Sequence, residues 1–313
     1  MNVAMTFPGQ GSQAVGMGKE LAETFPEAKA VFAEVDDALS QDLSSIIFEG
    51  DQDTLTLTAN AQPALMAVSM AVVKVLESKG YSIADKVGFV AGHSLGEYSA
   101  LCAAGTFSIA DTAKLLRIRG NAMQEAVPVG KGAMAAIIGL EQAQVEQICE
   151  DSKQAGVCQI ANDNGGGQLV ISGSKAEVEQ AAEKAKEAGA KRALILPVSA
   201  PFHSAMMSPA ADAMQEALSN VSANTPCVPL IVNVLAAPIT DVEEIKKRLV
   251  EQVTGQVRWR ESVEWMGQNG VSNLIEAGSG KVLSGLARRI NRDLASANIA
   301  SPADIDAFLE ASS

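Results

Sequence analysis

A serine flanked by two glycines is the feature of this sequence best suited to chemistry. Residues 92–96 read Gly-His-Ser-Leu-Gly and follow an apolar run that ends at Ala91. This spacing lets Ser94 occupy a sharp turn between a strand and a helix, with its hydroxyl exposed at the top of a parallel sheet. The two glycines fit such a strained turn because a side chain on either flank would clash. The pattern predicts a nucleophilic serine, and the alternative is a glycine-rich turn in an ordinary α/β domain.

A serine nucleophile needs a base within hydrogen-bond reach, and the sequence contains two histidines. His93 adjoins Ser94, so its side chain should point in another direction, and we expect a packed residue that bonds to nearby backbone. His203 follows an expected strand and a proline-containing loop, where catalytic groups gather above a sheet. It is the predicted base, and the alternative is a surface histidine at a helix start. No carboxylate between Ser94 and His203 stands out, so a dyad oriented by a backbone or amide oxygen is compatible with the pattern.

Two further segments allow more than one interpretation. Residues 9–14 read Gly-Gln-Gly-Ser-Gln-Ala after a short strand, which formally fits a dinucleotide fingerprint. That fingerprint needs a second strand with an acidic end about 20 residues later, whereas residues 26–42 look helical. A loop of exposed N–H groups that stabilise an oxyanion is the better interpretation. Arg119 lies in a largely apolar helix and also allows two interpretations. An arginine there usually extends to solvent or forms a salt bridge, but near an active site it could bind a carboxylate through two hydrogen bonds.

Strands alternate with helices over most of the sequence, which indicates a parallel sheet covered on both faces. Between residues 128 and 198 the order changes to strand, helix, strand, strand, helix, strand, the order of a ferredoxin-like unit. We therefore predict an α/β fold in which residues 1–127 and 199–313 form a large α/β-hydrolase-like catalytic domain with a parallel sheet. Residues 128–198 form an inserted, smaller ferredoxin-like (βαββαβ) subdomain.

Composition narrows the class of protein. The chain has 313 residues, 47% of them hydrophobic, and a net charge of −13, which disfavours nucleic-acid binding. Its four cysteines lack the Cys-x-x-Cys spacing typical of zinc sites. We therefore expect them to be free thiols in a reducing compartment and expect no metal site. The first residues lack the features of a signal peptide, and no uninterrupted apolar run is long enough to span a bilayer. We expect a cytoplasmic protein that binds neither nucleic acid nor membrane.

Several short motifs together are more specific than any one of them. They are residues 7–13 (Phe-Pro-Gly-Gln-Gly-Ser-Gln), 61–65 (Ala-Gln-Pro-Ala-Leu), 92–97, Arg119-Gly120 with Met123-Gln124, 201–203 (Pro-Phe-His), the region 252–259, and 276–280 (Glu-Ala-Gly-Ser-Gly). With these motifs the chain resembles, over essentially its whole length, the malonyl-coenzyme A:acyl carrier protein transacylases of fatty acid synthesis and the acyltransferase domains of polyketide synthases.

The resemblance implies a two-step acyl transfer. The malonyl group would pass from malonyl-coenzyme A to Ser94, and from this ester to the pantetheine thiol of acyl carrier protein, supplying fatty acid elongation. His203 would be the base for both steps. Gln252 falls where the family has a glutamine whose backbone carbonyl orients the histidine, which accounts for the missing triad carboxylate.

The same resemblance assigns the remaining site residues. Backbone N–H groups of Gln10 and Leu95 would form the oxyanion hole. Arg119 and Gln252 would be the substrate-binding residues, and Arg119 would hold the malonyl carboxylate. No metal or cofactor is implied beyond the coenzyme A thioester, which is the substrate. The expected partners are malonyl-coenzyme A and acyl carrier protein, and the enzyme is expected to be a monomer.

Alternatives remain open for the function and for carrier docking. A serine esterase or thioesterase would let water take the second step, and an oxidoreductase would use residues 9–14 for a dinucleotide. Because both this chain and the carrier proteins are acidic, docking needs a local basic patch. The candidate is the last helical stretch, and the alternative there is a solvated helix face. Its cations are Lys281, Arg288, Arg289 and Arg292.

Overall fold

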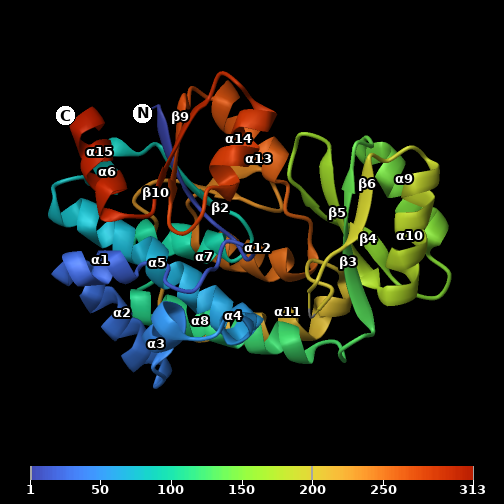
Figure 1. Cartoon of the computed structure of the whole chain (residues 1–313), viewed down its shortest axis with the longest axis horizontal. Coiled ribbons are helices and arrows are strands. Elements are labelled where there is room, and N and C mark those ends of the chain that lie inside the picture. The colour runs from blue at the N-terminus through green and yellow to red at the C-terminus, as the bar shows by residue number, and fades with distance from the viewer. Residues whose placement is uncertain (1, 199, 313) are drawn as a thin grey trace.

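The computed structural model describes residues 2–198 and 200–312, whose strands form two separate sheets (Figure 1). The larger sheet has six strands in the order β10-β9-β1-β2-β7-β8. Neighbouring strands are parallel from β10 to β7, and β8 adds an antiparallel edge. The bounds are β1 (Val3–Phe7), β2 (Phe89–Gly92), β7 (Leu230–Val232), β8 (Ala237–Ile239), β9 (Asn273–Ala277) and β10 (Ala295–Ile299).

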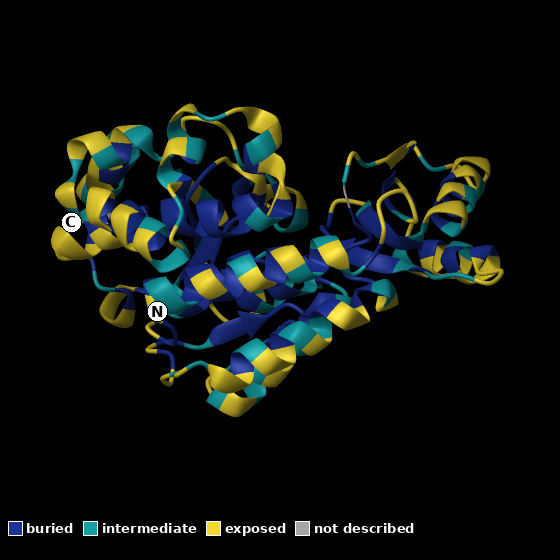
Figure 2. Ribbon diagram, turned by 90° about the horizontal axis from the view of Figure 1, so that it is seen from below, coloured by how far each residue is buried: buried dark blue, intermediate teal, exposed yellow. Residues whose placement is uncertain are grey.

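Successive residues of the central strands point to opposite faces of this sheet. Met5 and Val90 pack into the larger buried cluster, while their neighbours Ala4 and Ala91 pack into a second one. The larger cluster includes α5 (Thr58–Ser78), α7 (Gly96–Ala103) and α8 (Ile109–Glu125), and the second includes α13 (Trp259–Gln268) and α14 (Val282–Ile290). Figure 2 shows the buried strands in dark blue between helices whose outer faces are yellow. The predicted parallel sheet with helices on both faces is confirmed.

The smaller sheet forms a separate antiparallel layer, drawn in green and yellow at one end of the molecule in Figure 1. Its order is β4-β5-β3-β6, with two helices between the strands and a buried cluster of its own. The elements are β3 (Gly132–Ile138), α9 (Gln142–Ser152), β4 (Cys158–Asp163), β5 (Gln168–Ser174), α10 (Lys175–Glu187) and β6 (Arg192–Ile195). The βαββαβ order is the predicted ferredoxin-like one. The domain limits at 128 and 198 stay a prediction, and residue 199 lies outside the described residues.

Other elements complete the larger part of the fold. They are α1 (Lys19–Thr24), α2 (Pro26–Leu39), α3 (Leu43–Glu49), α4 (Gln52–Thr56), α6 (Ile83–Lys86), a 3-10 turn (Ala205–Met207), α11 (Ser208–Asn220), α12 (Val242–Thr254) and α15 (Pro302–Ser312). Helices α1 and α2 are separate, because Phe25 between them precedes a proline and is extended, with φ −122° and ψ 122°. The edge strand β10 reads Ala-Ser-Ala-Asn-Ile and lacks the apolar run that would have predicted it.

Helix α5 is the one helix among the described residues that is long and apolar enough to cross a membrane. It has 21 residues, but polar side chains interrupt it, so a search for uninterrupted apolar runs misses it. In the fold, 89% of its most apolar 18-residue stretch is buried. A core helix of a globular domain has the same length and composition, so this finding is a weak indication of a membrane span.

Candidate active site

Ser94 lies in the turn that joins β2 to α7, and its backbone has a positive φ of 54°. A Cβ at Gly92 would lie 1.9 Å from backbone atoms of Gly96, and one at Gly96 would lie 2.2 Å from the carbonyl oxygen of Phe7. Both glycines are therefore required by the close approach of backbone segments. The Ser94 N–H donates to Asn233 Oδ1 at 2.8 Å, which ties the turn to the end of β7. The strand–turn–helix geometry is the one that the glycine spacing predicts.

The Ser94 hydroxyl and the His203 imidazole are in direct contact. Ser94 Oγ lies 2.7 Å from His203 Nε2, and His203 Nδ1 lies 2.8 Å from the main-chain carbonyl oxygen of Gln252. A carbonyl only accepts, so Nδ1 carries the proton and Nε2 is free to accept one from the serine. Burial, reinforced by the nearby charge of Arg119, lowers the pKa of His203 to about 3. The imidazole is therefore neutral near pH 7, which is the form that a base requires.

Arg119 brings a buried positive charge to the same place from α8. Its side chain is 2% exposed, and its Nη2 donates to Ser94 Oγ at 3.2 Å. Amide oxygens hold the guanidinium on both sides: Nη1 donates to Gln62 Oε1 and Nη2 to Gln252 Oε1, each at 2.8 Å. Within the described part of the chain Arg119 takes part in no ion pair. A buried cation whose hydrogen-bond partners are neutral is well suited to pair with a carboxylate from a ligand.

The approach of α8 to α5 explains how Arg119 reaches this position. Gly120 follows Arg119, and a Cβ there would lie 2.7 Å from the Ala59 Cα. A glycine at this position therefore lets the two helices come close, so that Arg119 meets Gln62 in the first turns of α5. Gln62 Nε2 in turn donates to Thr58 Oγ1 at 2.9 Å.

The two predicted oxyanion residues border the same cavity as Ser94. The side chain of Gln10 is fixed, since its Oε1 accepts a hydrogen bond from Thr58 Oγ1 at 2.9 Å. Among the hydrogen bonds found for residues 2–198 and 200–312, none uses the backbone N–H of Gln10 or of Leu95. Two backbone donors without protein acceptors beside a serine can stabilise a developing oxyanion.

The cavity has a volume of about 620 Å³ and lies between the two sheets. The larger part of the fold contributes Gln10, Gln62, Ser94, Leu95, Arg119 and His203, and the smaller sheet contributes Met134, Asn162, Gln168 and Val170. Phe202, directly before the histidine, and the loop 196–198 also line it. All six predicted site residues except Gln252 border this cavity, and Gln252 lies directly beneath it, in contact with both His203 and Arg119.

His93 points away from the serine hydroxyl, as its sequence position predicts, but its partner differs from the expected backbone. Its Nε2 lies 2.9 Å from Asn164 Oδ1, in the turn after β4, and its ring lies 5.7 Å from the ring of Trp259. Burial lowers the pKa of His93. The expectation of a local backbone partner is wrong because the turn brings the smaller sheet against the imidazole, a long-range contact that the sequence does not reveal.

Three polar residues of the site were not predicted from the sequence. Gln62, Asn233 and Glu97 are each less than 2% exposed and hydrogen-bond to the residues around Ser94. Asn233 directly follows β7, and the carboxyl end of a parallel strand is where ligand-binding residues gather. That position was one available signal. Gln62 and Glu97 lie in the motifs 61–65 and 92–97, but nothing in those motifs gave either side chain a role in the site.

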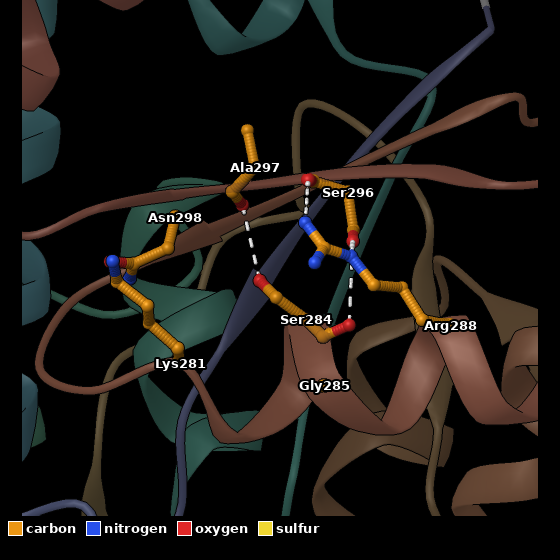
Figure 3. A pocket seen from close by; sticks show the side chains of 7 residues that line it. All are labelled: Lys281, Ser284, Gly285, Arg288, Ser296, Ala297 and Asn298. Atoms are coloured by element: carbon orange, nitrogen blue, oxygen red, sulfur yellow. Dashed lines mark hydrogen bonds between the residues drawn. The ribbon is translucent and has the colours of Figure 1, made fainter.

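The predicted basic patch is divided by the structure. A second cavity of about 290 Å³ lies between α14 and β10. There Arg288 Nε donates to Ser296 Oγ at 3.1 Å, and Figure 3 shows the residues that line it. Lys281 borders both this cavity and the active-site cavity. Arg289 borders the active-site cavity, and its Nη1 donates to Gln168 Oε1 at 3.4 Å. The cations of α14 therefore face two different hollows.

A family model described as an acyl transferase domain matches residues 5–293. The chain belongs to the acyl transferase family. It is 48% identical over 309 residues to the malonyl CoA-acyl carrier protein transacylase of Bacillus subtilis, covering 98% of this chain and 96% of that protein. This membership removes the dinucleotide interpretation of residues 9–14.

Solved structures of acyl transferases agree with the fold. The acyl-carrier-protein-S-malonyltransferase of Bartonella henselae is 64% identical, with a TM-score of 0.98 over 99% of each chain. A malonyl-transacylase solved in complex with its type II PKS acyl-carrier protein is 42% identical, with a TM-score of 0.96 over 99% of this chain and 100% of that one. In the described residues of this acyl transferase, no group of three or more His, Cys, Asp or Glu side chains could hold a metal ion. The prediction that no metal or cofactor is needed stays a prediction.

Proposed function

We propose that this acyl transferase moves the malonyl group from malonyl-coenzyme A to the pantetheine thiol of an acyl carrier protein, and so supplies fatty acid elongation. The relatives' names support the substrates. The observation that carries the proposal is the buried guanidinium of Arg119, whose Nη2 lies 3.2 Å from Ser94 Oγ and which lacks a carboxylate partner among the described residues. A cation at this distance from a nucleophile suits a short acyl group that ends in a carboxylate.

In the first step, His203 Nε2 takes the proton of the Ser94 hydroxyl as Oγ attacks the thioester carbonyl carbon. The negative charge that develops on the carbonyl oxygen is stabilised by the N–H groups of Gln10 and Leu95. The C–S bond then breaks, His203 returns the proton to the departing coenzyme A thiolate, and malonyl remains as an ester of Ser94.

In the second step, the thiol of the carrier's pantetheine takes the place of coenzyme A. His203 removes its proton, the thiolate attacks the ester carbonyl, and the same two N–H groups stabilise the oxyanion. The ester C–O bond breaks and Ser94 regains its proton from His203. The dyad returns to its starting state, so no redox change or external base is needed.

Arg119 connects substrate recognition to the base. Its positive charge is one cause of the low pKa of His203. When a malonyl carboxylate pairs with the guanidinium, this charge is neutralised locally, and the pKa of His203 rises. The bound substrate therefore makes the imidazole a stronger base, while it remains neutral near pH 7.

The carrier is proposed to dock beside the mouth of the cavity, near Lys281 and Arg289. These cations border the active-site cavity in an otherwise acidic chain, so they offer a local attraction for an acidic partner. A relative has been solved in complex with its acyl-carrier protein. We also propose that the enzyme acts as a monomer in the cytoplasm, which light scattering of the purified protein and cell fractionation would test.

The function is tested by incubating the protein with malonyl-coenzyme A and measuring its intact mass, then adding holo acyl carrier protein. A transacylase retains one malonyl group and passes it to the carrier. A hydrolase releases malonate and leaves the protein unlabelled, and that result would overturn the proposal in favour of a serine esterase or thioesterase.

A further inference from the structure

A buried carboxyl group lies beneath the active site without touching the cavity. Glu97 stands in the first turn of α7, and its side chain is 0% exposed. Glu97 Oε1 accepts a hydrogen bond from the Asn233 N–H at 3.2 Å, and Oε2 accepts one from Gln252 Nε2. Both oxygens are therefore acceptors, and no mechanistic step uses the group.

The Gln252 carboxamide links this carboxylate to Arg119. Its Nε2 donates to Glu97, to the main-chain carbonyl of Ser94 at 2.9 Å and, more weakly, to Asn233 Oδ1 at 3.4 Å, so the acceptors around the amide nitrogen fix its orientation. Its Oε1 is thereby turned toward Arg119 Nη2, at 2.8 Å. If the amide were reversed, its N–H groups would face the guanidinium, and a donor would oppose a donor.

Asn233 is the second residue that Glu97 contacts, and its backbone N–H donates to the Glu97 carboxylate. The Asn233 side chain holds the serine turn: its Oδ1 accepts from the Ser94 N–H at 2.8 Å, and its Nδ2 donates to the Gly92 carbonyl at 2.7 Å. Glu97 thus contacts both Asn233, which holds the serine turn, and Gln252, which binds the guanidinium of Arg119.

We infer that Glu97 is a positioning residue for carboxylate recognition: it fixes the Gln252 carboxamide, which in turn aims Arg119 at the terminal carboxylate of the acyl group. It acts through Gln252 and Asn233 and does not touch substrate. This inference rests on the proposed malonyl transfer and names a residue that supports, through Gln252, the selection of malonyl over acetyl by Arg119.

Ionised Glu97 offers an acceptor at both oxygens, whereas a protonated carboxyl places an O–H donor on one of them, opposite a donor from Asn233 or Gln252. Burial raises the pKa of Glu97 to about 8, opposed by its hydrogen bonds from Gln252 and Asn233 and by the charge of Arg119. The titratable groups that face it are Arg119 of α8 and the neighbouring Tyr98 of α7. The ionised fraction rises as the pH rises through this pKa, so acylation by malonyl-coenzyme A should become faster over the same range, whereas acylation by acetyl-coenzyme A should not.

The test is the Glu97→Gln variant, with single-turnover acylation by malonyl- and acetyl-coenzyme A at about pH 6.5 and about pH 9. A glutamine replaces one of the two carboxylate oxygens with an NH2 group, so either the Asn233 N–H or Gln252 Nε2 faces a donor in place of an acceptor. At the higher pH we expect malonyl acylation to fall roughly 10- to 100-fold, the range for a lost hydrogen bond to a buried charge. At the lower pH the loss should be much smaller, and acetyl acylation should change little at either.

Glu276→Gln is the matched control. Glu276 is also 0% exposed and accepts from the backbone N–H groups of Leu283 and Ser284 at 3.0 and 2.8 Å, away from the dyad. The same chemical change there should lower stability without changing the malonyl-to-acetyl ratio or its pH dependence. If Glu97→Gln does not fold, Glu97→Asp keeps an ionisable carboxyl and should keep the rise with pH.

Equal loss of malonyl and acetyl acylation in the Glu97→Gln variant, or an unchanged rise with pH, would overturn the inference and make Glu97 a structural residue. The wild-type protein is measured first. If wild type takes up no malonyl group at all, the proposed function fails, and that outcome is distinct from a failure of the role of Glu97.

Discussion

Two sets of contacts meet at the Ser94 hydroxyl and differ in kind. On one side, His203 and the main-chain carbonyl of Gln252 form a neutral pair that can serve any acyl group. On the other side, Arg119 carries a buried charge held by amide oxygens, which benefits only an acyl group that ends in an anion. The comparison separates the transfer of an acyl group from its selection.

The two sides share one residue, but they use different parts of it. The main chain of Gln252 orients the imidazole, and its side chain orients the guanidinium. Changes on the guanidinium side should therefore alter which acyl group is accepted, and changes on the imidazole side should alter the rate for all of them. The largest effect is expected at the serine hydroxyl that both sides share, and the smallest at the docking surface.

Removal of the serine hydroxyl should abolish both transfers. In the Ser94→Ala variant no malonyl or acetyl group should be retained, because the only proposed acyl-carrying atom is gone. Intact mass measurement followed by peptide mapping of the wild-type protein should place the added mass on Ser94. A label on another residue, or full activity of the variant, would show that the turn carries a different role.

Removal of the guanidinium should affect one acyl group only. Loss of one partner of a buried charge pair costs about 2–5 kcal/mol, which corresponds to roughly 30-fold to a few thousand-fold in kcat/KM. Arg119→Ala should therefore lose malonyl transfer by that factor and keep or gain acetyl transfer. If the two activities fall together, Arg119 is structural and another residue must read the carboxylate.

The imidazole side should be insensitive to pH over the range where an ordinary histidine titrates. Burial and the Arg119 charge lower the pKa of His203 to about 3, and the neutral form is the active base. Acylation by acetyl-coenzyme A, which does not need the guanidinium, should stay constant from about pH 8 down to about pH 5 and fall only at lower pH. A fall centred at the ordinary histidine value, about 6.5, would contradict this environment.

The smallest effect is expected at the docking surface, where the two arginines of α14 face different hollows. Charge reversal at Arg288 and Arg289 should raise KM for acyl carrier protein by about two- to fivefold, as is usual for exposed charges, and leave KM for malonyl-coenzyme A nearly unchanged. Arg292→Glu, in the turn that follows α14 and lining neither cavity, is the control. Equal effects on both substrates, or none, would count against this surface.

The parts of the site that follow from local patterns could be predicted from the sequence. The glycines around Ser94 are needed by the turn itself, and His203 was the remaining histidine once His93 was set aside by its direction. The ferredoxin-like order was visible for the same reason, since each strand and helix of residues 128–198 carries its own pattern.

The supporting contacts could not be predicted, because they join distant parts of the chain. Glu97 contacts Asn233 and Gln252 only after α7, β7 and α12 have packed together, and the partners are 136 and 155 positions apart in the sequence. Gln62 contacts Arg119 because Gly120 lets α8 and α5 come close together. His93 contacts Asn164, which belongs to the smaller sheet's part of the chain. No local period or spacing encodes such pairs.

The most direct test of the division between transfer and selection is the malonyl-to-acetyl ratio in two variants, His203→Ala and Arg119→Ala, measured as single-turnover acylation by intact mass. We predict that His203→Ala slows both reactions by a similar factor and leaves the ratio near that of the wild type. Arg119→Ala should lower the ratio by roughly 30-fold or more. If Arg119→Ala leaves the ratio unchanged, or if His203→Ala shifts it as strongly, transfer and selection are not carried by separate contacts and the account is wrong.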